Sequence, residues 1–196
     1  MTTTQQCTAF EGTRRVASGG LPEVALKVKV VLDRGERAPV LIFDDATSEV
    51  VELDFRGTAE EVLRKLGEGE VPEAMPESET PRGPGRPRLG VVAREVTLLP
   101  RHWEWLNRQP GGASVALRKL VEEARRVNGA KDRLRQAQEC AYRFLSAMAG
   151  NEPGFEEALR ALFAGNRARF GDWVEGWPVD VRDHAKKLAE GAFAEA

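Results

Sequence analysis

Residue types with distinctive chemistry are scarce in this chain of 196 residues, which has two histidines, two cysteines and a single tyrosine. Cys7 and Cys140 lie far apart and show no C-x-x-C spacing, which favours two buried or idle thiols in a cytosolic protein. With only His102 and His184 available, we do not expect a histidine-based metal site.

Long apolar runs are also missing. No stretch of about 18 apolar residues occurs, which argues against a membrane-spanning helix. The first residues, M-T-T-T-Q-Q-C-T, have neither the basic nor the apolar region of a secretory signal, so we expect a cytoplasmic protein. No nucleotide-binding loop, metal-ligand cluster or Ser-His-Asp arrangement is visible in the sequence. We therefore expect a protein that is not an enzyme and that uses no cofactor.

Charge is distributed unevenly along the chain. Residues 82–126 contain ten basic and four acidic residues, a net charge of +6, whereas the whole chain carries -2 and the remainder therefore -8. A basic block within an acidic protein is a stronger indication of nucleic-acid binding than the overall isoelectric point of about 5.9.

The sequence predicts an α+β protein. We expect a small N-terminal β-rich unit with one helix (1–66), a Pro-rich linker whose charge changes from acidic to basic (67–88), a central strand-helix-helix unit (89–127) and a C-terminal helical bundle (128–196).

In the N-terminal unit, the β-branched run over 24–32 predicts a strand, and the runs 40–43 and 50–55 predict a hairpin. Thr58 and Glu61 have the spacing of a capping box, which predicts a helix that ends near Gly67. In the C-terminal region, apolar residues recur at helical spacing and predict helices that end near Gly150 and Gly165, with a last helix that opens at Pro178.

The central unit begins with a strand over 91–99, which Pro100 ends. Since proline is tolerated in the first turn of a helix, a first helix can follow directly over 101–108. Ser114 is a natural N-cap for a second helix, whose apolar stripe consists of Leu117, Leu120, Val121 and Ala124. Trp103 and Trp105 cannot share one helix face, so we expect one to be buried and the other to be exposed or at an interface.

This order of elements, with the run G-A-S-V-A-L-R-K-L-V-E-E-A at 112–124, resembles ribbon-helix-helix repressors. The resemblance implies an obligate homodimer whose paired strands enter the major groove of double-stranded DNA. It also implies that Ala113 and Ser114, at the start of the second helix, hold a backbone phosphate.

Two phases of the strand stay open, because Arg94 and Thr97 lie on opposite faces of a regular strand. The family's phase, counted back from Pro100, turns Glu95 inward and buries a carboxylate, which is costly. The other phase points Glu95 and Thr97 at the groove. Arg94 and Thr97 are both candidate DNA contacts, but on a regular strand only one of them can contact bases.

The arm before the strand, P-G-R-P-R at 84–88, resembles an AT-hook, in which a G-R-P core lies along the narrow A·T minor groove. Here Pro84 stands where the usual motif has its first arginine, and Arg82 is displaced. The resemblance implies A·T-rich DNA as the partner, with Arg82, Arg86 and Arg88 in contact with groove or phosphates.

Over nearly its full length the chain resembles an uncharacterised bacterial family, known as domain of unknown function family 2239. The runs G-R-P-R-L-G-V-V-A-R-E-V-T-L-L-P-R-H-W-E-W-L and Q-P-G-G-A-S-V-A-L-R-K-L-V-E-E-A carry the resemblance. We expect a dimeric bacterial transcriptional regulator that binds DNA. The alternative is a non-enzymatic protein-interaction or dimerisation module, which captures a protein partner without DNA.

Overall fold

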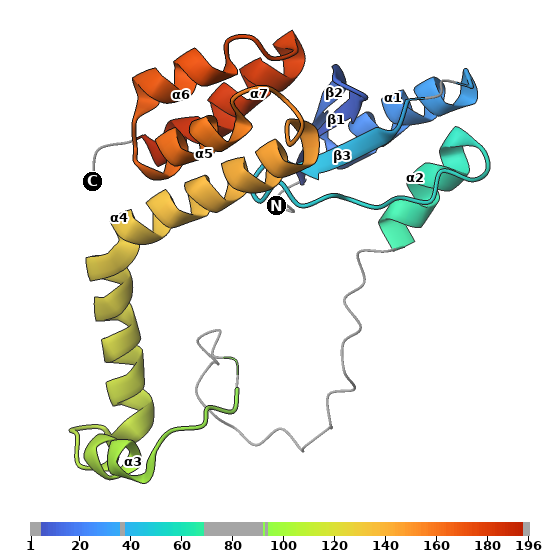
Figure 1. Cartoon of the computed structure of the whole chain (residues 1–196). Coiled ribbons are helices and arrows are strands. Elements are labelled where there is room, and N and C mark those ends of the chain that lie inside the picture. Colours follow the sequence, from blue (N-terminus) through green and yellow to red (C-terminus); the bar gives the residue numbers. More distant parts are fainter. Residues whose placement is uncertain (1–4, 36–37, 69–91, 93, 194–196) are drawn as a thin grey trace. The chain divides into compact units, whose positions relative to one another are not determined.

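The computed structural model describes residues 5–35, 38–68, 92 and 94–193 (Figure 1). The described chain forms a mixed α+β structure with a three-stranded antiparallel sheet near the N-terminus, seven α-helices and a mostly helical C-terminal part. This confirms the predicted fold class. Two compact units are present: residues 1–70 together with 130–196, and residues 71–129.

The sheet of the larger unit has the strand order β2-β1-β3. Its central strand β1 (Gln6–Glu11) pairs antiparallel with both β2 (Arg14–Gly20) and β3 (Val40–Asp44). Both faces of β1 are covered, because side chains alternate across a strand and all residues from Cys7 to Glu11 are buried. Cys7 and Ala9 pack into one core cluster, and Phe10 belongs to a second one.

Residues 21–33 form a helix, α1 (Leu21–Asp33), so the prediction of a strand over 24–32 is wrong. Pro22 stands in the first turn, where its missing N–H needs no partner. Val24, Ala25, Val28 and Val31 are buried, and their spacing is that of one helical face. This face packs against the sheet in the cluster that contains Cys7, Ala9 and Ile42.

The predicted hairpin forms only in part. β3 is present, but its expected partner over 50–55 is reduced to an isolated bridge between Phe43 and Val50 and a hydrogen bond from the Val51 N–H to the Ile42 carbonyl (2.8 Å). The chain turns at Ser48, which has a positive φ of 53°. Beyond Val51 it leaves the sheet edge, and Asp54 binds side chains near α2 instead.

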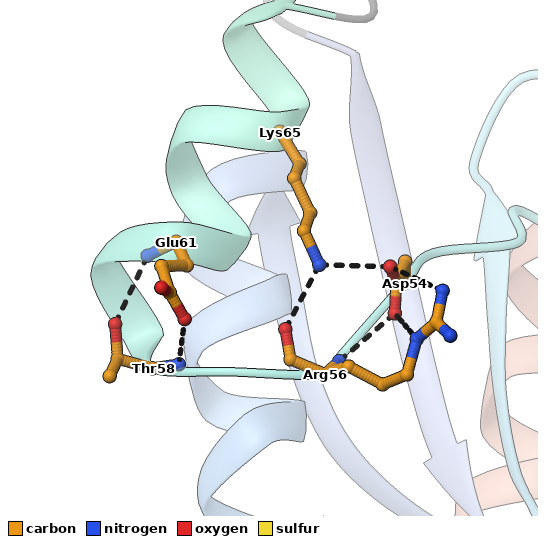
Figure 2. A network of polar contacts seen from close by, with 5 residues as sticks. All are labelled: Asp54, Arg56, Thr58, Glu61 and Lys65. Carbon is orange, nitrogen blue, oxygen red and sulfur yellow. Dashed lines mark hydrogen bonds and ion pairs between the residues drawn. The ribbon is translucent and has the colours of Figure 1, made fainter.

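The capping box of helix α2 (Ala59–Glu68) is confirmed. The Glu61 carboxylate accepts a hydrogen bond from the Thr58 N–H (2.8 Å), and the Thr58 hydroxyl accepts one from the Glu61 N–H (3.3 Å). Figure 2 shows a second group of contacts beside the capping box: Lys65 donates to the Asp54 carboxylate (2.8 Å) and to the Arg56 carbonyl (3.0 Å). The pKa of Asp54 is lowered because it accepts hydrogen bonds from Arg56 and Lys65.

In the C-terminal part, the predicted helix ends at Gly150 and Gly165 are confirmed. The helices are α5 (Phe155–Phe163), α6 (Arg167–Val174) and α7 (Val179–Ala189), followed by the short 3₁₀ turn η1 (Glu190–Ala192). Gly165 has a φ of 67°, a conformation that side chains disfavour. The residues predicted to form one helix up to Gly150 belong to a longer helix, α4 (Gly112–Met148).

One core joins the N-terminal sheet to the C-terminal helices. Phe10 and Phe43 from the sheet contact Phe144 from α4 with ring centroids 5.4 and 5.3 Å apart. The same cluster contains Leu145, Leu162, Phe170 and Trp177. The segments before residue 70 and after residue 130 are therefore one folding unit in space, although a long stretch of chain separates them in sequence.

Candidate nucleic-acid interface

The smaller unit contains the segment for which the sequence predicts DNA binding. Helix α3 (Pro100–Asn107) begins as predicted, with Pro100 in its first turn after the extended Leu99. It ends at Arg108, and the side chains of Arg108 and Gln109 donate to the carbonyls of Glu104 and Trp105 (both 3.1 Å). The Trp105 carbonyl also accepts the Arg108 N–H (3.2 Å), so backbone and side-chain donors together cap the end of α3.

A double-glycine turn connects α3 to α4. Gly111 and Gly112 have φ angles of 85° and 74°, which glycine adopts without steric cost. The Gly112 N–H donates to the Gln109 carbonyl (2.9 Å), and α4 begins at Gly112. Ser114 is therefore the third residue of α4. The prediction that Ser114 is the N-cap of this helix is wrong. An N-cap at Ser114 would place the first helical residue at Val115, so α4 begins three residues earlier than predicted.

The predicted strand over 91–99 does not form within a single chain. Among its residues, Val92 and 94–99 are described and belong to no strand. Val91 and Ala93 lie outside the described residues. In the ribbon-helix-helix arrangement this strand pairs with the same strand of a second chain. Its formation in a dimer therefore remains a prediction.

The predicted DNA contacts fall into three groups. Arg82, Arg86 and Arg88, like most of the linker 67–88, lie outside the described residues. Arg94 and Thr97 are exposed and precede α3, whereas Ala113 and Ser114 occupy the first turn of α4. Among the predicted DNA contacts that the structure describes, only Ala113 and Ser114 lie in the same helix.

Basic side chains dominate the described surface of the smaller unit. Residues 92 and 94–129 contain seven basic and four acidic residues, and all seven basic side chains are exposed. Three of them form ion pairs along their own helix: Arg108 with Glu104, Arg125 with Glu122, and Arg126 with Glu123. Among the described residues, Arg94, Arg101, Arg118 and Lys119 have no acidic partner within ion-pair distance.

The same unit buries very little. Of its described apolar side chains, only Leu106 and Ala116 are buried. Trp103 and Trp105 are both exposed, so the expectation that one of them is buried is wrong for the single chain. Eight large hydrophobic side chains are exposed, and these are Val92, Val96, Leu99, Trp103, Trp105, Leu120, Val121 and Val127. A surface so rich in exposed apolar groups is typical of an interaction site.

The larger unit contains a polar cluster that the sequence did not predict. The Thr8 hydroxyl donates to Asp45 (2.7 Å) and lies 3.0 Å from the Ser18 hydroxyl, and Lys187 lies 3.6 Å from the Asp45 carboxylate. His184 is buried, and its ring contacts the rings of Phe10 and Phe144. The sequence placed His184 only within the last helix, because the residues that surround it come from distant segments.

A buried histidine accompanies this cluster. Burial lowers the pKa of His184 to about 4, so its imidazole is neutral near pH 7, and its Nε2 atom has no hydrogen-bond partner among the described residues. No group of three or more His, Cys, Asp or Glu residues in the described chain is placed to hold a metal ion.

Both cysteines are buried and free, as predicted. Burial, followed by the charges of Asp44 and Asp45, raises the pKa of Cys7 to about 11. Burial also raises the pKa of Cys140, whose Sγ lies 3.0 Å from the Ser48 hydroxyl. Both thiols are therefore protonated near pH 7 and poor nucleophiles.

Comparison with known proteins identifies the class of the chain. A family model described as "Uncharacterized protein conserved in bacteria (DUF2239)" matches residues 6–189. The chain therefore belongs to this bacterial family, with the α+β fold described above as its structure. No curated protein and no solved structure matches it. Within the described residues, no helix is both long enough and apolar enough to cross a membrane.

Proposed function

We propose that this chain is a cytoplasmic DNA-binding protein, a bacterial transcriptional regulator that acts as a homodimer through residues 82–126. The observation that carries the proposal is the basic surface of the smaller unit. Arg94 and Arg101 are exposed there without an ion-pair partner among the described residues, and residues 92 and 94–129 bury few apolar side chains. Unpaired arginines of this kind favour contact with a polyanion.

The first turn of α4 supports a phosphate contact. The first N–H groups of an α-helix have no carbonyl partner within the helix, and the helix dipole favours an anion there. Ala113 and Ser114 lie in this turn, and Ser114 is exposed. In the proposed complex their N–H groups hold a backbone phosphate of the duplex.

The exposed apolar residues support the homodimer. Among the described residues of this unit, only two apolar side chains are buried, Leu106 and Ala116. So small a core does not offset the conformational entropy that these residues lose on folding. A second chain that covers the apolar surface supplies the missing burial. Pairing of residues 92–99 across two chains would also satisfy the backbone of the predicted strand.

The exposed Trp103 and Trp105 favour a second candidate function, a module for binding another protein. Tryptophan is enriched where protein interfaces are strongest. In this alternative the basic residues steer an acidic protein partner, and DNA is not bound.

Fluorescence anisotropy with random and A·T-rich duplexes at several salt concentrations tests the proposal. We expect an affinity that falls steeply with salt. An Arg86→Ala/Arg88→Ala double variant and an Arg94→Ala/Arg101→Ala double variant should each reduce the slope of log affinity against log salt by about 2, because each arginine neutralises about one phosphate.

An Arg34→Ala/Arg169→Ala double variant is the matched control. It also removes two exposed arginines, but these belong to the larger unit, so the salt slope should stay unchanged. Absence of binding at low salt would overturn the DNA-binding proposal and favour the protein-binding module. An equal effect of all three double variants would show only nonspecific attraction to the whole surface.

A further inference from the structure

The exposed face of α4 between Leu117 and Ala124 has an unusual internal order. Leu120 and Val121 are 48% and 56% exposed. The sequence L-R-K-L-V-E-E-A at 117–124 is antisymmetric about a point between Leu120 and Val121. Apolar positions mirror apolar positions, and the two basic residues on one side mirror the two acidic residues on the other.

Helix geometry assigns these charges to two flanks of the apolar face. Successive residues are about 100° apart around the axis, so Arg118 and Glu122 share one flank, and Lys119 and Glu123 share the other. Glu122 and Glu123 pair with Arg125 and Arg126 one turn further along. Arg118 and Lys119, by contrast, have no ion-pair partner among the described residues.

We propose that this face of α4 binds the same face of a second copy in antiparallel orientation, with the two-fold axis between Leu120 and Val121. In a two-fold interface the same patch contacts itself, so every pairing occurs twice. Leu117 then lies opposite the partner's Ala124, while Leu120 and Val121, on either side of the two-fold axis, each lie beside the same residue of the partner. Four apolar side chains from each copy form the centre of the contact.

The charges fit this orientation. Antiparallel helices related by a two-fold axis bring identical flanks together. Arg118 therefore meets the partner's Glu122 on one side, and Lys119 meets the partner's Glu123 on the other. Arg118 and Lys119, which form no ion pair within the described part of their own chain, each gain an acidic partner in the dimer. A second copy therefore covers the apolar face and also pairs the charges beside it.

Parallel, in-register pairing of the two helices does not bring opposite charges together. It brings opposite flanks together, so Arg118 would lie beside the partner's Lys119 and Glu122 beside the partner's Glu123. Like charges then face each other on both sides of the contact, which is destabilising. The proposal specifies the surface and orientation of the homodimer proposed above, and it holds whether or not the protein binds DNA.

Cysteine cross-linking of the full chain, without DNA, tests the orientation. We expect Leu117→Cys and Ala124→Cys variants to form a disulfide-linked dimer efficiently when the two are mixed. Each variant alone should cross-link poorly, because in the antiparallel pair the two copies of residue 117 lie about 10 Å apart along the helix axis. The unmodified chain is the control, since Cys7 and Cys140 are buried. Efficient cross-linking of each variant alone would overturn the antiparallel pairing.

Sedimentation equilibrium tests the surface itself. A Val121→Lys variant should raise the dimer dissociation constant at least tenfold. Val30→Lys is the matched control, because Val30 is also exposed on a helix, at 51% compared with 56%, but belongs to the larger unit. A chain that stays monomeric at every concentration up to the solubility limit would overturn the proposal, as would equal dissociation of both variants. Neither outcome would bear on DNA binding by the monomer, which the anisotropy measurement tests separately.

Discussion

Among single residues, His184 is a buried group whose protonation is linked to folding. Its ring packs edge-on against Phe144, with centroids 4.6 Å apart, and is 2% exposed. Burial lowers its pKa from 6.5 to about 4. The negative charge of Asp45 acts against this shift, while the positive charges of Lys187 and Arg15 add to it.

This environment predicts a loss of stability in mild acid. Because the folded pKa lies below the unfolded value, the unfolded chain takes up the proton first as the pH falls. The contribution of His184 is therefore fully present above pH 6.5 and is lost as the pH falls from 6.5 to about 4. The loss is about 3 kcal/mol, at 1.36 kcal/mol per pKa unit. Urea unfolding at a series of pH values measures it.

His184→Phe is the comparison variant, since it keeps an aromatic ring beside Phe10 and Phe144 but cannot titrate. Its free energy of unfolding should depend less on pH between 6.5 and 4 than that of the unmodified chain, whatever its absolute stability. Parallel pH profiles for the two proteins would contradict the buried, neutral state of His184.

For the helices as elements, local signals in the sequence decide where they begin and end. The capping box of α2 is an example: Thr58 and Glu61 exchange hydrogen bonds as their spacing predicts. Pro100 likewise opens α3, and Gly165 follows α5. Each of these signals involves only a few neighbouring residues, so the sequence alone is enough to predict the helix end.

The capping box predicts different effects for two neighbouring glutamates. Both Glu60 and Glu61 lie in the first turn of α2, where their charge favours the helix dipole, but only Glu61 accepts the Thr58 N–H. Glu61→Ala should lower the stability of α2 by about 1 kcal/mol, and Glu60→Ala by a few tenths. Hydrogen exchange of the α2 amides measures both. Equal losses would mean that the charge alone, and not the cap, stabilises the helix.

Helix α1 shows where a local signal misleads. The run from Val24 to Leu32 is rich in β-branched residues, which favour strands. However, its buried positions follow helical spacing, and Pro22 and Glu23 are typical of a first helical turn. The sheet needs a covering layer on the face that contains Cys7 and Ala9, and tertiary packing of α1 there outweighs the intrinsic preference.

In the whole molecule, the core around Phe144 joins the two ends of the chain. Phe144→Ala should lower the free energy of unfolding by about 3–5 kcal/mol. It should also speed amide exchange in β1 and α7 together, because Phe10, Phe43 and the residues of α7 belong to the same cluster. Tyr142→Ala is the control on the same helix, since Tyr142 is 45% exposed and lies outside this core. Faster exchange in the helices alone would show that the sheet folds independently.

The sequence alone determined the α+β class, the ends of most helices and the basic character of residues 82–126, because composition, periodicity and capping residues act locally. Only the tertiary structure decided that residues 24–32 are helical, that the sheet and the C-terminal helices share one core, and that the smaller unit leaves Trp103 and Trp105 exposed. These features depend on contacts between residues up to about 170 positions apart, such as Phe10 with His184. No local pattern specifies such a contact, since it forms only when both segments have folded.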